Sequence, residues 1–111
     1  MSELCLIVTI VRNGWGDRVI DASLKAGAEG ATVMLGRGVG IHEHRFFMGI
    51  PIEPEKEIVL SVIRRDKADL ILEEIIKALE LDKPGHGLAF VLPIEKLVGM
   101  VHALHEPAKD G

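Results

Sequence analysis

LIVTIVRNGWGDRVIDASLKA, residues 6–26, returns 52 positions later as IVLSVIRRDKADLILEEIIKA, residues 58–78, and the two copies align without a gap. Each copy begins with β-branched and apolar residues and then changes to apolar residues at helical spacing. The repeat therefore predicts a strand followed by a helix in each half of the chain.

A further strand follows each of these units, because short apolar runs come after glycine-containing breaks. The predicted strands are Leu4–Val11, Thr32–Leu35, Glu57–Ile63 and Leu88–Leu92, and the predicted helices are Asp17–Ala26 and Asp66–Leu81. This β-α-β-β-α-β order predicts an α+β, ferredoxin-like sandwich with a four-stranded antiparallel sheet, in one domain covering residues 1–111.

Two segments have no clear period. Ile41–Glu55 contains two prolines and is expected to be a loop or an extended hairpin arm. Pro93–Met100 is a short element whose type the sequence leaves open.

The composition limits the kinds of partner. Apolar residues make up 48 % of the chain and the formal net charge is −4, so the basic field that nucleic acid needs is missing. The single cysteine, Cys5, cannot form an internal disulfide, and no apolar run approaches the roughly 20 residues of a membrane helix. Because no secretion signal is visible, we expect a cytoplasmic protein that neither binds nucleic acid nor inserts into a membrane.

The predicted sheet has more apolar surface than two helices can cover. Residues 5–11 and 58–63 are apolar on both parities, whereas a solvated sheet face would alternate with polar residues. Each exposed Val or Ile would forgo roughly 1.5–3 kcal/mol of burial. We therefore expect other copies of the chain to cover the second face, as a homo-oligomer.

Two glycine-rich stretches are candidate binding elements. In GRGVG, the alternating Gly36, Gly38 and Gly40 either let another backbone approach or line the mouth of a ligand cleft. In PGHG, residues 84–87 form either a simple turn or a nest of backbone N–H groups for an anion.

The histidines allow a different chemistry. His42 and His44 share one side of an extended segment, and together with His86 they could form a metal site. Solvated loop histidines explain the same spacing, and no cysteine supports a metal site. No nucleophile–base pair, paired carboxylates or metal triad can be assembled, so we do not expect an enzyme.

In this order and on this plan, EGATVMLGRGVG (residues 29–40) and KPGHGLAFVLP (residues 83–93) resemble the P-II nitrogen-regulatory signal-transduction family, and the likeness extends from Leu4 to about Val101. The resemblance implies a homotrimer with three inter-subunit clefts that bind an adenine nucleotide. It also implies long loops that contact a regulated partner, an enzyme or transporter, in nitrogen metabolism.

The resemblance also implies site residues. Those matching the family's nucleotide-binding positions are Thr32, Gly38, Gly40, Lys56, Gly85 and Gly87, with His86 as a further donor in the turn. The basic positions of the family are filled here by Ile41, Leu88, Gly99 and Val101. We therefore expect AMP, ADP or a small anion to be favoured over ATP as the effector.

The sequence thus predicts a P-II-like trimeric regulator that senses a small effector. The alternative is a divalent-metal-binding trimer of the CutA-like type, with His42, His44 and His86 as ligands.

Overall fold

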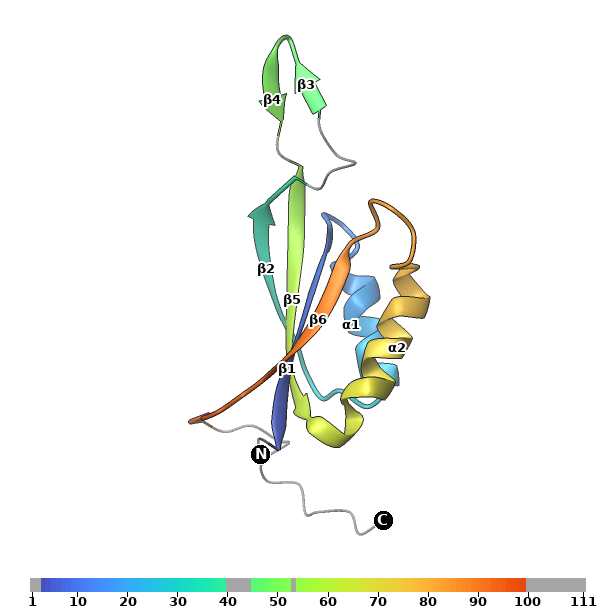
Figure 1. Cartoon of the computed structure of the whole chain (residues 1–111), viewed down its shortest axis with the longest axis vertical. Helices are drawn as coiled ribbons and strands as arrows, with labels where there is room; N and C mark the ends of the chain where they lie inside the picture. The colour runs from blue at the N-terminus through green and yellow to red at the C-terminus, as the bar shows by residue number, and fades with distance from the viewer. Residues whose placement is uncertain (1–2, 40–44, 53, 100–111) are drawn as a thin grey trace.

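The computed structural model describes residues 3–39, 45–52 and 54–99. In chain order, the elements are β1 (Leu4–Arg12), α1 (Gly16–Lys25), β2 (Thr32–Arg37), β3 (Arg45–Phe47), β4 (Ile50–Ile52), β5 (Glu55–Arg64), the 3₁₀ turn η1 (Arg65–Lys67), α2 (Ala68–Leu79) and β6 (Leu88–Pro93). Figure 1 shows the sheet with its two helices and the β3–β4 hairpin extending beyond one end.

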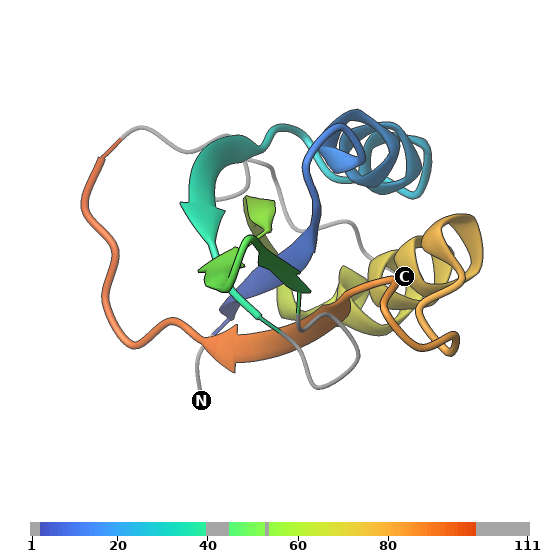
Figure 2. The same cartoon turned by 90° about the horizontal axis from the view of Figure 1, so that it is seen from above.

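The predicted fold class is confirmed. A four-stranded sheet has the strand order β2-β5-β1-β6, and every neighbouring pair is antiparallel. The repeated strands β1 and β5 lie side by side at its centre. Both helices pack on the same side of this sheet (Figure 2), as two right-handed crossovers require.

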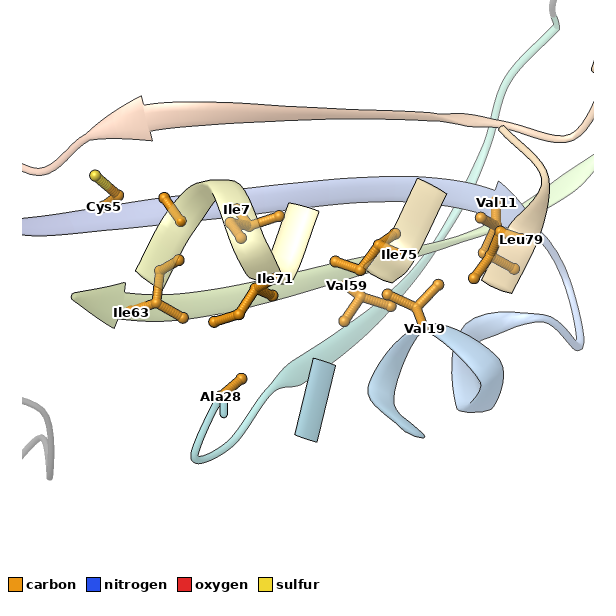
Figure 3. Close-up of a cluster of buried hydrophobic side chains, with 11 residues drawn as sticks. Cys5, Ile7, Val11, Val19, Ala28, Val59, Ile63, Ile71, Ile75 and Leu79 are labelled. Carbon is orange, nitrogen blue, oxygen red and sulfur yellow. The ribbon is translucent and has the colours of Figure 1, made fainter. Parts of the chain in front are cut away.

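The core lies between the helices and the sheet. One parity of β1 and β5 meets the apolar stripes of α1 and α2 (Figure 3), and Ile7, Ile71 and Leu79 are at most 1 % exposed. The spacing of the buried α2 residues Ile71, Ile75 and Leu79 is the helical period read from the sequence.

The other face of the sheet is apolar and uncovered in the single chain. Register places Leu6, Val8 and Ile10 of β1 opposite Leu92, Phe90 and Leu88 of β6. On β6 these three side chains are 46, 40 and 51 % exposed, and Met34 on β2 is 44 % exposed. The folded single chain therefore exposes the apolar sheet face that was expected from the sequence.

Several boundaries differ from the sequence-based expectation. The strand β5 begins at Glu55 because Glu55 and Lys56 pair with Arg37 and Gly36 of β2. The second helix is shorter than predicted: a 3₁₀ turn occupies residues 65–67, and the helix ends where Glu80 adopts a left-handed conformation (φ 53°). Residues 94–99 form neither helix nor strand.

The segment expected to be a loop or hairpin arm contains a two-stranded hairpin, β3 with β4. Its strands are joined by Met48 and Gly49, both with positive φ (51° and 80°), as in the tight turns that match strand twist. Residues 41–44 and 53 of that segment lie outside the described residues. We call β3 and β4 the hairpin arm.

Candidate functional site

One end of the sheet collects the polar and glycine-rich features. Here Gly36 of β2 pairs with Lys56 of β5, and Lys56 pairs with Arg12 of β1. Directly opposed residues share a sheet face, so two cations and a glycine form one row at this end. We call this region the site end.

The glycine turn, Gly85–Gly87, adjoins this row. Gly87 has φ +125°, and a Cβ there would collide with the carbonyl oxygen of Ile10 in β1. Only glycine therefore allows the turn to lie against the end of β1. The Arg12 guanidinium reaches the turn, with its Nη2 3.5 Å from the Gly85 carbonyl oxygen.

Trp15 contacts three side chains beside the site end. The guanidinium carbons of Arg12 and Arg18 lie 4.3 and 4.8 Å from its ring centroid, and the His86 ring meets it edge-on at 5.1 Å. These contacts are cation–π and T-shaped aromatic interactions. Trp15 is the residue immediately before α1 and is partly buried against the core.

Two glutamates at the start of β5 hold the turn that carries Trp15. We call residues 13–16 the tryptophan turn. The Glu57 Oε1 atom accepts hydrogen bonds from the backbone N–H groups of Gly14 (2.9 Å) and Gly16 (2.7 Å). Glu55 accepts from the Asn13 backbone N–H (3.2 Å) through its carbonyl oxygen and from Asn13 Nδ2 (2.9 Å) through its carboxylate. A carboxylate beside the first turn of α1 also matches the positive end of the helix dipole.

Side chains from this region satisfy the carboxyl end of α2. Arg18 Nη2 donates to the Ala78 carbonyl oxygen and His86 Nδ1 donates to that of Leu79, both at 2.9 Å. The last carbonyls of a helix have no partner within it, and their negative dipole end favours a cation. These bonds therefore fasten the site end to both helices.

A local ion pair precedes the glycine turn. Lys83 Nζ lies 2.7 Å from Glu80 Oε2. The hydrogen bond from Lys83 and its positive charge lower the pKa of Glu80, and the same bond to Glu80 raises the pKa of Lys83.

Most of the predicted site residues meet at this end. Gly38 continues the β2 edge, donating its N–H to the Pro54 carbonyl (3.2 Å), and a Cβ on it would lie 4.0 Å from Lys56 Cγ. The turn residues Gly85, His86 and Gly87 lie across Arg12 from Lys56. His86 was expected to offer a donor, and its Nδ1 is occupied by the Leu79 carbonyl.

Thr32 does not join this group within one chain. It pairs with Leu60, four residues along β5 from Lys56 and hence roughly 13 Å away. Gly40 lies outside the described residues.

Arg12 is the functional candidate that sequence reasoning missed. The repeat aligns Arg12 with Arg64, so the sequence gives no sign that Arg12 differs from its counterpart at the end of the other strand. The available signal was its place next to the Asn13–Gly14 break. Of the positions where the family has positive charge, Leu88 is 51 % exposed and Gly99 has φ +132°, while Ile41 and Val101 lie outside the described residues.

The described residues give no support to the metal alternative. Across residues 3–39, 45–52 and 54–99, no three His, Cys, Asp or Glu side chains are grouped to hold a metal ion. His42 and His44 lie outside these ranges, and His86 contacts Trp15 and Leu79. Neither described helix is long and apolar enough to cross a membrane.

The antiparallel sheet with two helices on one side, and a glycine turn lying against the end of β1, defines a ferredoxin-like α+β domain. The family model for "Nitrogen regulatory protein P-II" matches residues 4–101, so this chain belongs to the P-II family of signal-transduction proteins. Its fold is similar to a crystal structure of Arabidopsis thaliana PII bound to citrate, with 28 % sequence identity and a TM-score of 0.66 over 84 % of this chain and 78 % of that chain. A comparison with curated proteins gives no match.

Proposed function

We propose that this P-II family member is a homotrimeric cytoplasmic regulator, without catalytic activity of its own. It binds a small anionic effector at the site end, in a cleft shared by neighbouring copies. Filling the cleft changes how the hairpin arm engages a regulated enzyme or transporter, in keeping with the nitrogen regulation of the family.

The apolar open face supports the trimer. Met34, Phe90 and Leu92 expose 40–46 % of their surface in the single chain. Burying this face between copies would stabilise the assembly by about 25 cal/mol per Å² of apolar area. Association would also let Thr32 of a neighbouring copy complete the cleft, which a single chain leaves without it.

The observation that carries the effector proposal is the row of Arg12 and Lys56 beside the glycine turn. Two cations and the backbone N–H groups of Gly85 and Gly87 suit one phosphate or carboxylate group, whereas the His86 N–H donates to the Lys83 carbonyl oxygen (3.2 Å). A triphosphate needs more positive charge, and Leu88 and Gly99 supply none. The citrate in the Arabidopsis PII structure shows that a tricarboxylate binds that relative.

Calorimetry with AMP, ADP, ATP and citrate tests this proposal. We expect AMP, ADP or citrate to bind more tightly than ATP. Each of Arg12→Ala and Lys56→Ala should weaken binding by about tenfold or more, since a charge-assisted hydrogen bond contributes roughly 1.5–3 kcal/mol. Arg64→Ala, at the repeat-equivalent position at the far end of β5, is the matched control and should leave binding unchanged. Submicromolar ATP affinity with much weaker AMP would contradict the effector proposal.

Light scattering tests the assembly separately. We expect three times 12.1 kDa at micromolar concentration. A monomer under these conditions would exclude the shared cleft.

A further inference from the structure

We propose that the tryptophan turn links the occupied glycine turn to the root of the hairpin arm, so that residues 13–16 transmit effector binding to the arm. The inference rests on the proposed function, because it takes the glycine turn as the effector site and the arm as the responding element. It adds the route between them and the residues that form it.

On the arm side, the link is made by the first residues of β5. β4 ends at Ile52 and β5 begins at Glu55, so the returning strand of the arm enters the sheet where Glu55 and Glu57 bind the tryptophan turn. Two of these hydrogen bonds, at 2.7 and 2.9 Å, share Glu57 Oε1. A displacement of the turn therefore pulls directly on the residues that follow the arm.

Glu57 and the tryptophan turn are closely packed. A Cβ added to Gly16 would lie 2.8 Å from Glu57 Oε1, closer than real Cβ atoms approach an oxygen. The repeat-equivalent position at the start of α2 carries Ala68, where a Cβ is accommodated. Glycine at position 16 thus allows the carboxylate of Glu57 to sit directly on the turn.

On the effector side, the link is made by Arg12 and Trp15. Trp15 contacts the His86 ring within the glycine turn, and Arg12 both stacks on Trp15 and reaches Gly85. The Arg12–Gly85 contact is long (3.5 Å) and exposed, so it is weak. An anion at the glycine turn would offer Arg12 a charge-assisted partner and draw its guanidinium away from its present position.

The link therefore joins a weak contact, between Arg12 and Gly85, to short hydrogen bonds between Glu57 and the tryptophan turn. Movement of Arg12 on effector binding repositions Trp15, and the tight Glu57 hydrogen bonds carry that movement to the arm root. Two sites coupled in this way must influence one another reciprocally, which makes the coupling measurable from either side.

The first experiment needs no ligand. Amide hydrogen exchange is measured on the full chain carrying Arg12→Ala and on the matched control Arg64→Ala, with Trp15 fluorescence as a second readout, since Trp15 is the single tryptophan. We expect Arg12→Ala to shift the emission and to accelerate exchange at Gly14, Gly16 and residues 55–57 by about tenfold, with no change for Arg64→Ala. A shifted emission with unchanged exchange at residues 55–57 would overturn the link.

The second experiment uses inorganic phosphate as the probe. In the unsubstituted protein, saturating phosphate should change Trp15 emission and slow exchange in residues 45–57. In Glu57→Ala, phosphate should still bind and still change the emission, but exchange in the arm should no longer respond. Glu57→Gln, which keeps the side-chain shape, gives the same test with a smaller effect if Glu57→Ala does not fold.

The outcomes separate the two proposals. An arm that responds to phosphate equally with and without Glu57 would overturn the link while leaving the effector site intact. Failure of phosphate, AMP and citrate to bind the unsubstituted protein would overturn the effector site, and the exchange comparison of Arg12→Ala with Arg64→Ala would still decide the link.

Discussion

The turn after β1 and the turn after β5 occupy equivalent positions in the internal repeat, where Arg12 corresponds to Arg64 and Trp15 to Lys67. After β5 the side-chain ion pair is local: Arg64 Nη2 lies 3.0 Å from Asp66 Oδ2, and a 3₁₀ turn leads directly into α2. One backbone hydrogen bond reaches further, from the Arg65 N–H to the Glu3 carbonyl oxygen (2.8 Å). After β1 the connection is long-range, because Glu55, Glu57 and His86 hold it from other parts of the chain.

The difference shows how one repeat unit supports both structure and function. The apolar residues of both copies pack in one core, so both halves keep the pattern that the fold needs. The polar residues at the end of each strand do not belong to this core, so they can differ between the two halves. Those at the end of β1 and in the turn after it contact the glycine turn and the root of the hairpin arm, whereas those after β5 begin a helix and bond to Glu3.

The largest expected effect comes from substituting Gly87, and a glycine at the other end of the sheet serves as its control. Gly87→Ala places a methyl group against the Ile10 carbonyl at a φ that L-residues avoid. We expect it to lower the free energy of unfolding by about 3 kcal/mol or more. Gly30→Ala, which precedes β2 and has no heavy atom within 4 Å of its Cβ, should change it by less than about 1 kcal/mol. Urea unfolding of both variants checks the contrast, and equal losses would remove the special role of the glycine turn.

The next effect compares the central residues of the two turns. Trp15→Ala removes contacts with two guanidinium groups and the His86 ring and should destabilise the fold by about 2–3 kcal/mol. Lys67→Ala, its repeat counterpart, should cost less than about 1 kcal/mol. Thermal unfolding measures both changes. A Lys67 variant as unstable as the Trp15 variant would mean that the two turns contribute equally to the stability of the fold.

The sequence predicted the fold well because the fold depends on periodicity. Strand and helix periods, read twice through the repeat, gave the six core elements and their order. Boundaries were missed where a long-range contact decides them, as at Glu55, which pairs with Arg37.

The site was predicted less completely, for a related reason. The glycine turn has a local signature, so Gly85 and Gly87 could be predicted as candidates from the sequence. Arg12 and Glu57 act through partners 73 and 41–43 residues away, and no local pattern indicates such contacts. The contact of Trp15 with His86 was not predicted either, since nothing near Trp15 in the sequence points to His86.

A smaller effect is expected inside the core, where the halves differ at Thr9 and its counterpart Ser61, both buried. Among the described residues, the Thr9 hydroxyl is a buried side-chain group without a hydrogen-bond partner. Thr9→Val keeps the shape and removes that desolvated hydroxyl, so it should raise the stability by about 1 kcal/mol. Ser23→Ala is the control, because the buried Ser23 hydroxyl donates to the Val19 carbonyl (2.7 Å) and its loss should not stabilise. Denaturant midpoints distinguish the two, and a destabilised Thr9→Val protein would refute the assignment.

The smallest effect is expected from the charges of the exposed Glu80–Lys83 ion pair, which precedes the glycine turn. The folded state lowers the pKa of Glu80 from 4.5, so its stabilising contribution is present above that value and disappears as the pH falls through the lowered pKa. The pKa of Lys83 is raised from 10.5, so the contribution of its charge is present below that value and disappears as the pH rises through the raised pKa. Glu80→Gln should therefore lower the melting temperature slightly at neutral pH and leave it unchanged in strong acid, where the native carboxylate is also neutral. Glu73→Gln, an exposed residue of the preceding helix α2, controls for the loss of one negative charge. Melting curves from pH 2 to pH 8 check the prediction, and a deficit that persisted at the lowest pH would show that Glu80 contributes through packing rather than through its charge.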